Sequence, residues 1–127
     1  MATGRDLVNV ALKEVGYREG ANNYNKYGAS FGDPNNAWCG YFVSWCLKQI
    51  GIDDYGGTGA SWMFALDARD RGIGTYHAKG SGYSPKLGDL FIADFNGVDW
   101  ARHVGIVKND ASGGYFNSID GNSSSGA

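Results

Sequence analysis

The sequence has few of the residues that usually cross-link a small protein or restrict its backbone. Its 127 residues include only two cysteines, two prolines and two histidines. A chain of this length can bury roughly two thirds of its unfolded surface, so it needs no disulfide to fold. Neither a C-x-x-C nor an H-x-x-x-H spacing occurs, which excludes the common pattern of a zinc site. We therefore expect a fold that is independent of redox compartment, with no cofactor and no metal.

The sequence also lacks an excess of either charge and any long apolar run. Eleven basic and 13 acidic residues give a net charge of -2, and no cluster of Lys or Arg occurs. This balance gives no support for a nucleic-acid partner or an anionic membrane surface. No stretch of about 18 apolar residues could span a bilayer, and the N-terminus has no long apolar core typical of a signal peptide. We expect a monomer that does not insert into membranes.

Glycine and aromatic residues, in contrast, are abundant. The chain contains 21 Gly, 8 Tyr, 6 Phe and 4 Trp. Many glycines beside many aromatic residues favour short strands and tight turns around a core of large rings, with some rings left to line a binding cleft.

The hydrophobic pattern changes period along the chain, from helical in the first half to strand-like in the second. Thr3 and Asp6 have the spacing of a helix-capping pair at the start of the first helix. Because helices come first and an antiparallel sheet second, we expect an α+β fold with N-terminal helices packed on a C-terminal sheet, forming one domain over residues 1–127 that can be a module of a longer chain. The expected helices cover residues 3–15, 38–50 and 61–72, and the expected strands cover residues 87–95, 103–107 and 115–122.

Cys39 stands at the start of the second expected helix. A cysteine in this position feels the positive end of the helix dipole and free backbone N–H groups, and both favour the thiolate. Cys46 lies seven positions further, which places the two Cα atoms roughly 10 Å apart along a helix. A disulfide needs them within about 7 Å, so these two cysteines cannot pair. Cys39 is the candidate nucleophile, and Cys46 has the pattern of a buried core residue.

A thiol nucleophile needs a base, and the base needs a polar group that holds its ring. His77 lies among glycines in a segment without a helix or strand signal, which is typical of a surface loop. His103 begins a strand, and the following strand carries Asp120 and Asn122 on one face. We therefore predict that His103 is the base and that Asp120, Asn122 or both support it.

Residues 28–32 match the serine-hydrolase pattern G-x-S-x-G around Ser30. That motif must follow a buried strand and open a helix. Here a polar segment precedes it and Asp33-Pro34 follows it, so we do not expect Ser30 to be a nucleophile.

Four segments resemble the motifs of CHAP domains, the cysteine, histidine-dependent amidohydrolase/peptidase modules of enzymes that cleave bacterial peptidoglycan. The resemblance implies a papain-like α+β fold, Cys39 as nucleophile, His103 as base and then acid, and Asp120 and Asn122 behind the histidine. Many members have Glu where Asp120 stands, which leaves open whether Asp120 or Asn122 contacts the ring. The matching segments are residues 38–45, 85–90, 103–107 and 119–122.

The resemblance also implies a substrate and a place of action. The substrate would be bacterial peptidoglycan, cleaved at the N-acetylmuramoyl-L-alanine amide or at a peptide bond by a phage lysin or a bacterial autolysin. The protein would act outside the cell, delivered by a phage or by other parts of a larger protein. Some relatives bind calcium just ahead of the cysteine, but here Asp33 is the only carboxylate in that region.

Two alternatives remain open at the level of sequence. A non-catalytic cell-wall-binding module could use the same cleft and aromatic residues to hold glycan. Trp38 and Tyr27 could line a groove for the sugar and peptide of the wall, or they could simply belong to the core, where aromatic residues are common.

Overall fold

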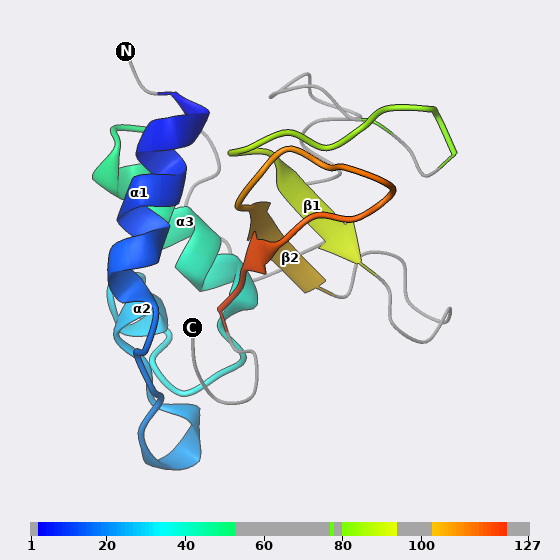
Figure 1. The fold of residues 1–127 in the computed structure, drawn as a ribbon. Coiled ribbons are helices and arrows are strands. Elements are labelled where there is room, and N and C mark those ends of the chain that lie inside the picture. The colour runs from blue at the N-terminus through cyan, green and yellow to red at the C-terminus, as the bar shows by residue number, and fades with distance from the viewer. Residues whose placement is uncertain (1–2, 53–76, 78–79, 94–102, 122–127) are drawn as a thin grey trace.

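Helices lie on one side of the molecule and a three-stranded antiparallel sheet on the other (Figure 1). The computed structural model describes residues 3–52, 77, 80–93 and 103–121. This arrangement confirms the expected α+β class, while the expected helix at residues 61–72 lies outside the described residues. In chain order the elements are α1 (Gly4–Glu14), a short 3-10 helix (Ala21–Asn23), α2 (Lys26–Ala29), α3 (Cys39–Gln49), β1 (Leu90–Ala93), β2 (His103–Val107) and β3 (Ser118–Ile119).

The first helix begins with the expected capping pair. The Thr3 Oγ1 atom accepts a hydrogen bond from the Asp6 N–H at 3.2 Å, and Asp6 Oδ2 accepts one from the Thr3 N–H at 2.9 Å. These two bonds satisfy donors that the start of a helix would otherwise leave without partners. The helix then buries Leu7, Val8 and Ala11 on one face.

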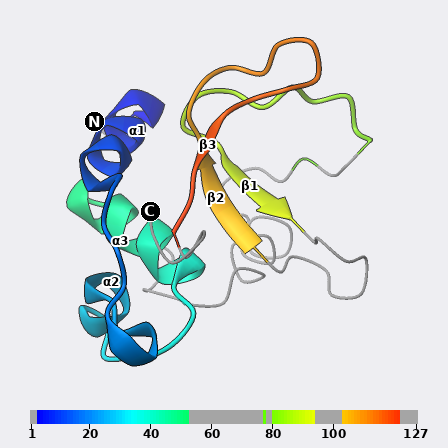
Figure 2. The same ribbon diagram turned by 60° about the horizontal axis from the view of Figure 1, so that its bottom comes forward.

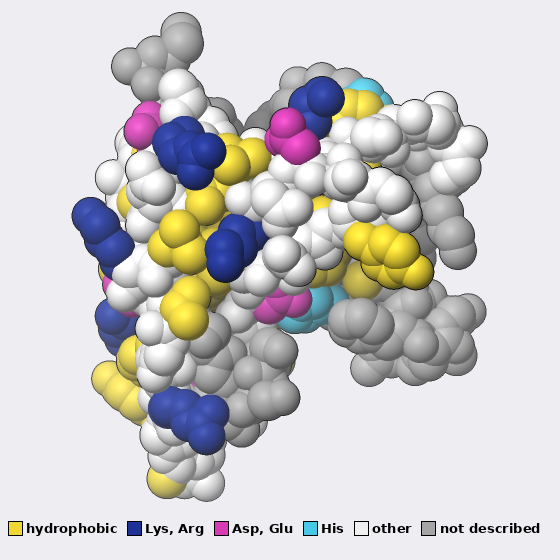
Figure 3. All heavy atoms as spheres, viewed as in Figure 1, with side chains coloured by type: hydrophobic (Ala, Val, Ile, Leu, Met, Phe, Trp, Pro, Cys, Tyr) yellow, Lys and Arg dark blue, Asp and Glu magenta, His cyan; other side chains and the backbone are white. Residues whose placement is uncertain are grey.

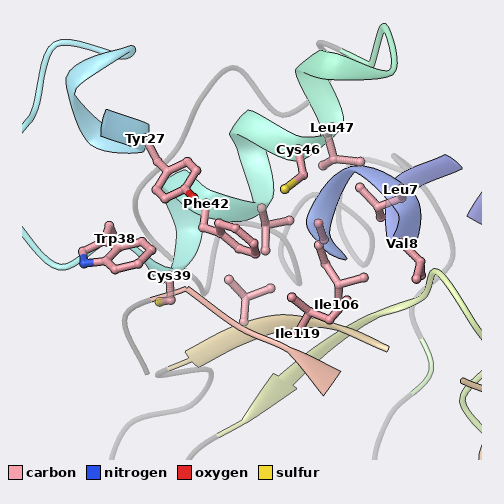
Figure 4. Close-up of a cluster of buried hydrophobic side chains, with 13 residues drawn as sticks. Leu7, Val8, Tyr27, Trp38, Cys39, Phe42, Cys46, Leu47, Ile106 and Ile119 are labelled. Carbon is pink, nitrogen blue, oxygen red and sulfur yellow. The ribbon is translucent and has the colours of Figure 1, made fainter. Parts of the chain in front are cut away.

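The core lies between the helices and the sheet (Figure 4). Its members come from α1, α2, α3 with the preceding Trp38, and the inward face of the strands. Burial of each large apolar side chain stabilises the fold by roughly 1.5–3 kcal/mol. Because α3 contributes side chains on almost every turn, it is the element on which the sheet packs. The buried side chains of this interface include Phe42, Val43, Cys46 and Leu47 from α3 and Val104, Ile106 and Ile119 from the strands.

The strands follow the order β1-β2-β3, with both pairs antiparallel (Figure 2). Phe91 pairs with Gly105, and Ile106 pairs with Ile119. Side chains of a strand alternate between its two faces. Val104 and Ile106 therefore point into the core, whereas Phe91 and Gly105 lie on the other face of the sheet.

β1 and β3 both begin later than expected, since a turn occupies the start of β1 and the Asn117 N–H just before β3 donates to Asn109 Oδ1 at 3.0 Å. The segment before β1 turns at Gly88, where φ is +88°, and Asp89 N–H donates to the Lys86 carbonyl at 2.9 Å. Ahead of β3, Gly113 and Gly114 both have positive φ between the bridged residues Ser112 and Tyr115. Two consecutive glycines of this kind form a tight hairpin turn rather than a strand.

Surface charge and helix length give two further observations. On the face seen in Figure 3, Lys and Arg side chains stand apart from one another, with apolar and uncharged side chains between them. No helix in the described ranges is both long and apolar enough to cross a bilayer.

The start of α1 is pressed against the turn before β1 at a contact between two glycines. A Cβ atom on Gly88 would collide with the Gly4 backbone, and a Cβ on Gly4 would lie 2.6 Å from the Leu87 carbonyl oxygen. No side chain other than hydrogen fits at either position. This contact packs the start of α1 against the turn that leads into β1.

We predict that Gly88→Ala is more destabilising than Gly82→Ala. Both glycines have a left-handed φ, +88° and +84°, so both changes carry a backbone cost of about 1–2 kcal/mol. Only Gly88 also meets backbone atoms, whereas Gly82 has nothing within 4 Å of the new methyl. Urea unfolding of the two variants measures the difference, and equal losses would contradict the close contact.

Candidate active site

Cys39 is the first residue of α3, where the backbone leaves N–H groups free. The residue before it, Trp38, makes no side-chain cap. By contrast, Thr3 caps α1 and Asn25 caps α2. The first turn of α3 therefore keeps its N–H groups and the positive end of its dipole for the sulfur and for any anion next to it. Figure 4 shows Cys39 at the edge of the core, beside the strands.

The environment of Cys39 lowers its pKa. Burial alone would raise the pKa, because it removes the thiolate from water. The hydrogen bond with His103, backbone hydrogen bonds from Val104 and Gly40, and the charge of the imidazolium outweigh burial and bring the pKa below the ordinary thiol value. Cys39 is thus an activated thiol.

His103 is held by Asp120. The His103 Nε2 and Asp120 Oδ2 atoms are 2.7 Å apart, and both side chains are largely buried, with exposed fractions of 12% and 18%. Asp120 directly follows β3, which pairs with β2, so the sheet itself brings the carboxylate to the histidine. Since Nε2 faces the carboxylate, Nδ1 is the ring nitrogen left for the sulfur of Cys39.

These contacts raise the pKa of His103 to about 9. The hydrogen bond to Asp120 is the largest cause, followed by the hydrogen bond with Cys39, while burial acts in the opposite direction. A raised imidazole pKa beside a lowered thiol pKa favours proton transfer from sulfur to the ring. The directions of the two shifts favour a thiolate beside an imidazolium over the neutral pair.

Of the two candidate partners of the histidine, Asp120 makes the contact. Asn122 lies outside the described residues. His77, the other histidine, is exposed and stacks on Tyr83, with ring centroids 3.6 Å apart. The structure thus brings together Cys39, His103 and Asp120.

Cys46 has the opposite environment on the same helix. It is fully buried, and burial is the main reason why its pKa is raised to about 12, with the nearby Glu14 adding to the effect. A thiol of this kind stays protonated at neutral pH and does not react as a nucleophile. Cys46 is a core residue.

Trp38 and Tyr27 do not line a groove. Both side chains have no exposed surface, and their rings stack with centroids 5.2 Å apart. The indole N–H donates to Glu19 Oε1 at 3.1 Å, and the Tyr27 hydroxyl donates to Glu14 Oε1 at 2.9 Å. Large rings bury much apolar area and still need a partner for their polar end. The two residues form the aromatic core behind Cys39 rather than a substrate surface.

Asn25 organises the loop that leads to Cys39, a role that the sequence did not indicate. Its side chain is fully buried, and its amide donates to the carbonyls of Asn23 at 3.0 Å and of Pro34 and Asn36 at 3.3 Å. Its Oδ1 atom accepts a hydrogen bond from the Gly28 N–H at 2.6 Å. A buried amide with all these partners fixes the loop. The only sequence signal is an Asn that precedes a short helix.

Gly121 is a second position that the sequence did not single out. A Cβ atom there would lie 2.8 Å from Phe42 Cγ and 3.0 Å from Trp38 Cε3. The missing side chain lets the segment that carries Asp120 approach the first turns of α3. Glycine next to the acidic residue of the motif is the signal that could have identified it.

The loop ahead of Cys39 offers few ligands for a cation. Its single carboxylate, Asp33, accepts a hydrogen bond from the Tyr41 hydroxyl at 2.7 Å through Oδ2. Calcium needs six to eight oxygen ligands, several of them carboxylates. Within the part of the chain that the structure describes, no three His, Cys, Asp or Glu residues are grouped to hold a metal.

The serine pattern around Ser30 does not form a nucleophile elbow. Ser30 ends the four-residue helix α2, and its hydroxyl donates to the Tyr27 carbonyl at 2.7 Å. An elbow requires a buried strand before the serine.

Comparison with known proteins identifies the family. Neither a search of curated proteins nor a search of solved structures finds a match. Residues 30–122, however, match the family model of the CHAP domain, and this range contains Cys39, His103 and Asp120. The helices and antiparallel sheet of the described residues are consistent with the papain-like α+β fold of this family. The chain therefore belongs to the CHAP domain family of amidohydrolases and peptidases.

Proposed function

We propose that this protein hydrolyses an amide bond of bacterial peptidoglycan, with Cys39 as nucleophile and His103 as acid and base. The observation that carries the proposal is the thiol of lowered pKa at the start of α3, hydrogen-bonded to a histidine that Asp120 holds at 2.7 Å. Membership of the CHAP family supports peptidoglycan as the substrate.

In the first step, the Cys39 sulfur attacks the amide carbonyl carbon and forms a C–S bond. The His103 imidazolium gives its proton to the leaving nitrogen, and the C–N bond breaks. This step needs the proton on His103, which a pKa of about 9 keeps there at neutral pH. The products are a free amine and a thioester on Cys39.

The negative charge on the carbonyl oxygen develops beside the start of α3. The Cys39 N–H and its neighbours lack a side-chain cap, so they can donate to this oxygen. Because these groups are fixed by the helix, they need no reorganisation during the reaction. One of these groups, the Gly40 backbone, also contributes to the lowered pKa of the thiol, after the larger effect of His103.

In the second step, water attacks the thioester and the now neutral His103 takes its proton. The C–S bond breaks, the acyl fragment of the wall leaves as a carboxylic acid, and the thiolate and imidazolium are restored. Asp120 keeps the ring oriented through both steps.

The bond cleaved is the N-acetylmuramoyl-L-alanine amide or a peptide bond of the stem or cross-bridge, and the protein acts on the wall from outside the cell as a phage lysin or a bacterial autolysin. A purely wall-binding module would have no use for an activated thiol beside a charged histidine. Lysis of susceptible cells, followed by turbidity, tests hydrolysis against binding. Mass spectrometry of the released fragments identifies which amide is cut.

We expect Cys39→Ala to abolish lysis, with a loss of more than about 10³-fold, because no other thiol can replace the nucleophile. Cys46→Ala should keep activity and lose only about 1 kcal/mol of stability from the small cavity. Turbidity and thermal unfolding measure these effects. At neutral pH iodoacetamide should label Cys39 first, and faster labelling of Cys46 would contradict the assignment.

We expect Asp120→Asn to reduce the rate by about 10²-fold or more and to move the alkaline limb of the pH profile downward. Asp120 is the main reason that the His103 pKa is raised from 6.5 to about 9. Without this carboxylate the ring loses its proton at lower pH, and activity falls there as well. Rates from pH 5 to 10 on purified wall material measure the shift.

The matched comparison for this variant is Asn122→Ala, which should reduce the rate less than Asp120→Asn does. If Asn122→Ala is the more damaging change and Asp120→Asn is nearly silent, Asn122 rather than Asp120 supports the histidine during catalysis.

We expect EDTA to leave both activity and melting temperature unchanged. Asp33 already bonds to Tyr41, and the loop is held by the Asn25 amide. A loss that calcium restores would show that the loop binds a cation.

A further inference from the structure

Three residues on the outward face of the sheet lie in one row across the strands. Phe91 in β1 pairs with Gly105 in β2. Ile106 pairs with Ile119, and extending this antiparallel register by one residue places Asp120 level with Gly105. Glycine therefore stands between an aromatic ring and the carboxylate that holds His103.

Because Gly105 has no side chain, the Phe91 ring and the Asp120 carboxylate both border the space above it. A Cβ atom on Gly105 would lie 2.7 Å from Asp120 Oδ1 and 2.7 Å from Phe91 Cζ, and it would collide with Phe91 Cε1. Gly105 does not have a positive φ, so its backbone does not require glycine. Glycine is required at position 105 because Phe91 and Asp120 occupy the space that a side chain would need.

The two carboxylate oxygens of Asp120 differ in their partners. Oδ2 bonds to His103, whereas Oδ1 is buried and has no hydrogen-bond partner among the residues that the structure describes. An unpaired buried carboxylate oxygen is costly and needs an explanation. The Phe91 atoms nearest the space above Gly105 are Cε1 and Cζ, so an apolar ring borders the same space as Asp120 Oδ1.

We propose that Phe91 is a positioning residue: its ring, lying over Gly105, keeps water from Asp120 Oδ1 and holds the carboxylate against His103. Its importance for catalysis rests on the proposed function, but the contact itself does not. Phe116 packs against Phe91 with ring centroids 5.5 Å apart.

The consequence is that the proton of His103 compensates the buried charge of Asp120. Within the described residues, the titratable groups that act on the ring are Cys39 from α3 and Asp120 after β3. Phe91 also lies near the imidazole, with centroids 6.0 Å apart, and carries no charge. Water admitted to Oδ1 would weaken the attraction between Asp120 and the imidazolium. His103 would then release its proton more readily.

Proton NMR of the histidine rings tests this directly, because the chain has only two histidines. The Hε1 signal of His103 is followed against pH, with exposed His77 as an internal reference. Phe91→Leu keeps an apolar side chain and removes the ring, and Phe91→Met is used in its place if the leucine variant does not fold. The expected result is a fall of about one pH unit in the His103 midpoint, a tenfold change, with His77 unmoved.

Two further variants separate positioning from packing. Ile92→Ala removes an apolar side chain from the same strand on the core face, and it should lower stability without moving the midpoint. In an Asp120→Ala background, Phe91→Leu should cause no further shift, because the effect passes through the carboxylate. An unchanged midpoint in folded Phe91→Leu, or an equal shift without Asp120, would overturn the proposal. The titration needs no wall substrate, so a protein that shows the shift but no lysis would refute the proposed function alone.

Discussion

The packing of the first turn of α3 against the start of β2 is the contact on which the site depends. Cys39 and His103 are far apart in the sequence, and each is the first residue of its element. Each also has a buried neighbour in its own element: Phe42 lies one turn after Cys39, and Val104 directly follows His103. Core packing therefore sets the distance between sulfur and ring. A displacement of about 1 Å can reduce a rate 10²-fold, so this interface must be rigid.

One helix carries two thiols with opposite chemistry, which shows how far environment overrides residue type. Cys39 has N–H groups and an imidazolium beside it, whereas Cys46 has apolar neighbours and the nearby charge of Glu14. The two residues differ only in their place along α3. Reactivity in this protein is thus a property of the helix end, and the rest of the helix serves the core.

The sequence predicted the features that depend on local signals and missed those that depend on distant contacts. Cys39 at a helix start and His103 at a strand start follow from spacing and caps, and the family resemblance pointed to Asp120. Whether Trp38 faces substrate or the core depends on what packs over it, and the pattern of aromatic residues does not reveal this. The late start of β1 arises from Gly88 meeting a helix from the other end of the chain. Contacts of this kind between distant segments can be predicted only when the register of the sheet is known.

The absence of a side-chain cap at Trp38 sets stability and catalysis against each other at one position. A Ser or Asp at a helix start typically stabilises a protein by about 1 kcal/mol. Here such a side chain would take N–H groups next to the Cys39 sulfur, which the proposed reaction also needs for its oxyanion, and Asp would add a negative charge beside the thiolate. The indole fills the position with packing instead, anchored by Glu19. Any effort to make this protein more heat-resistant should therefore leave residue 38 alone and improve helix ends that face no substrate.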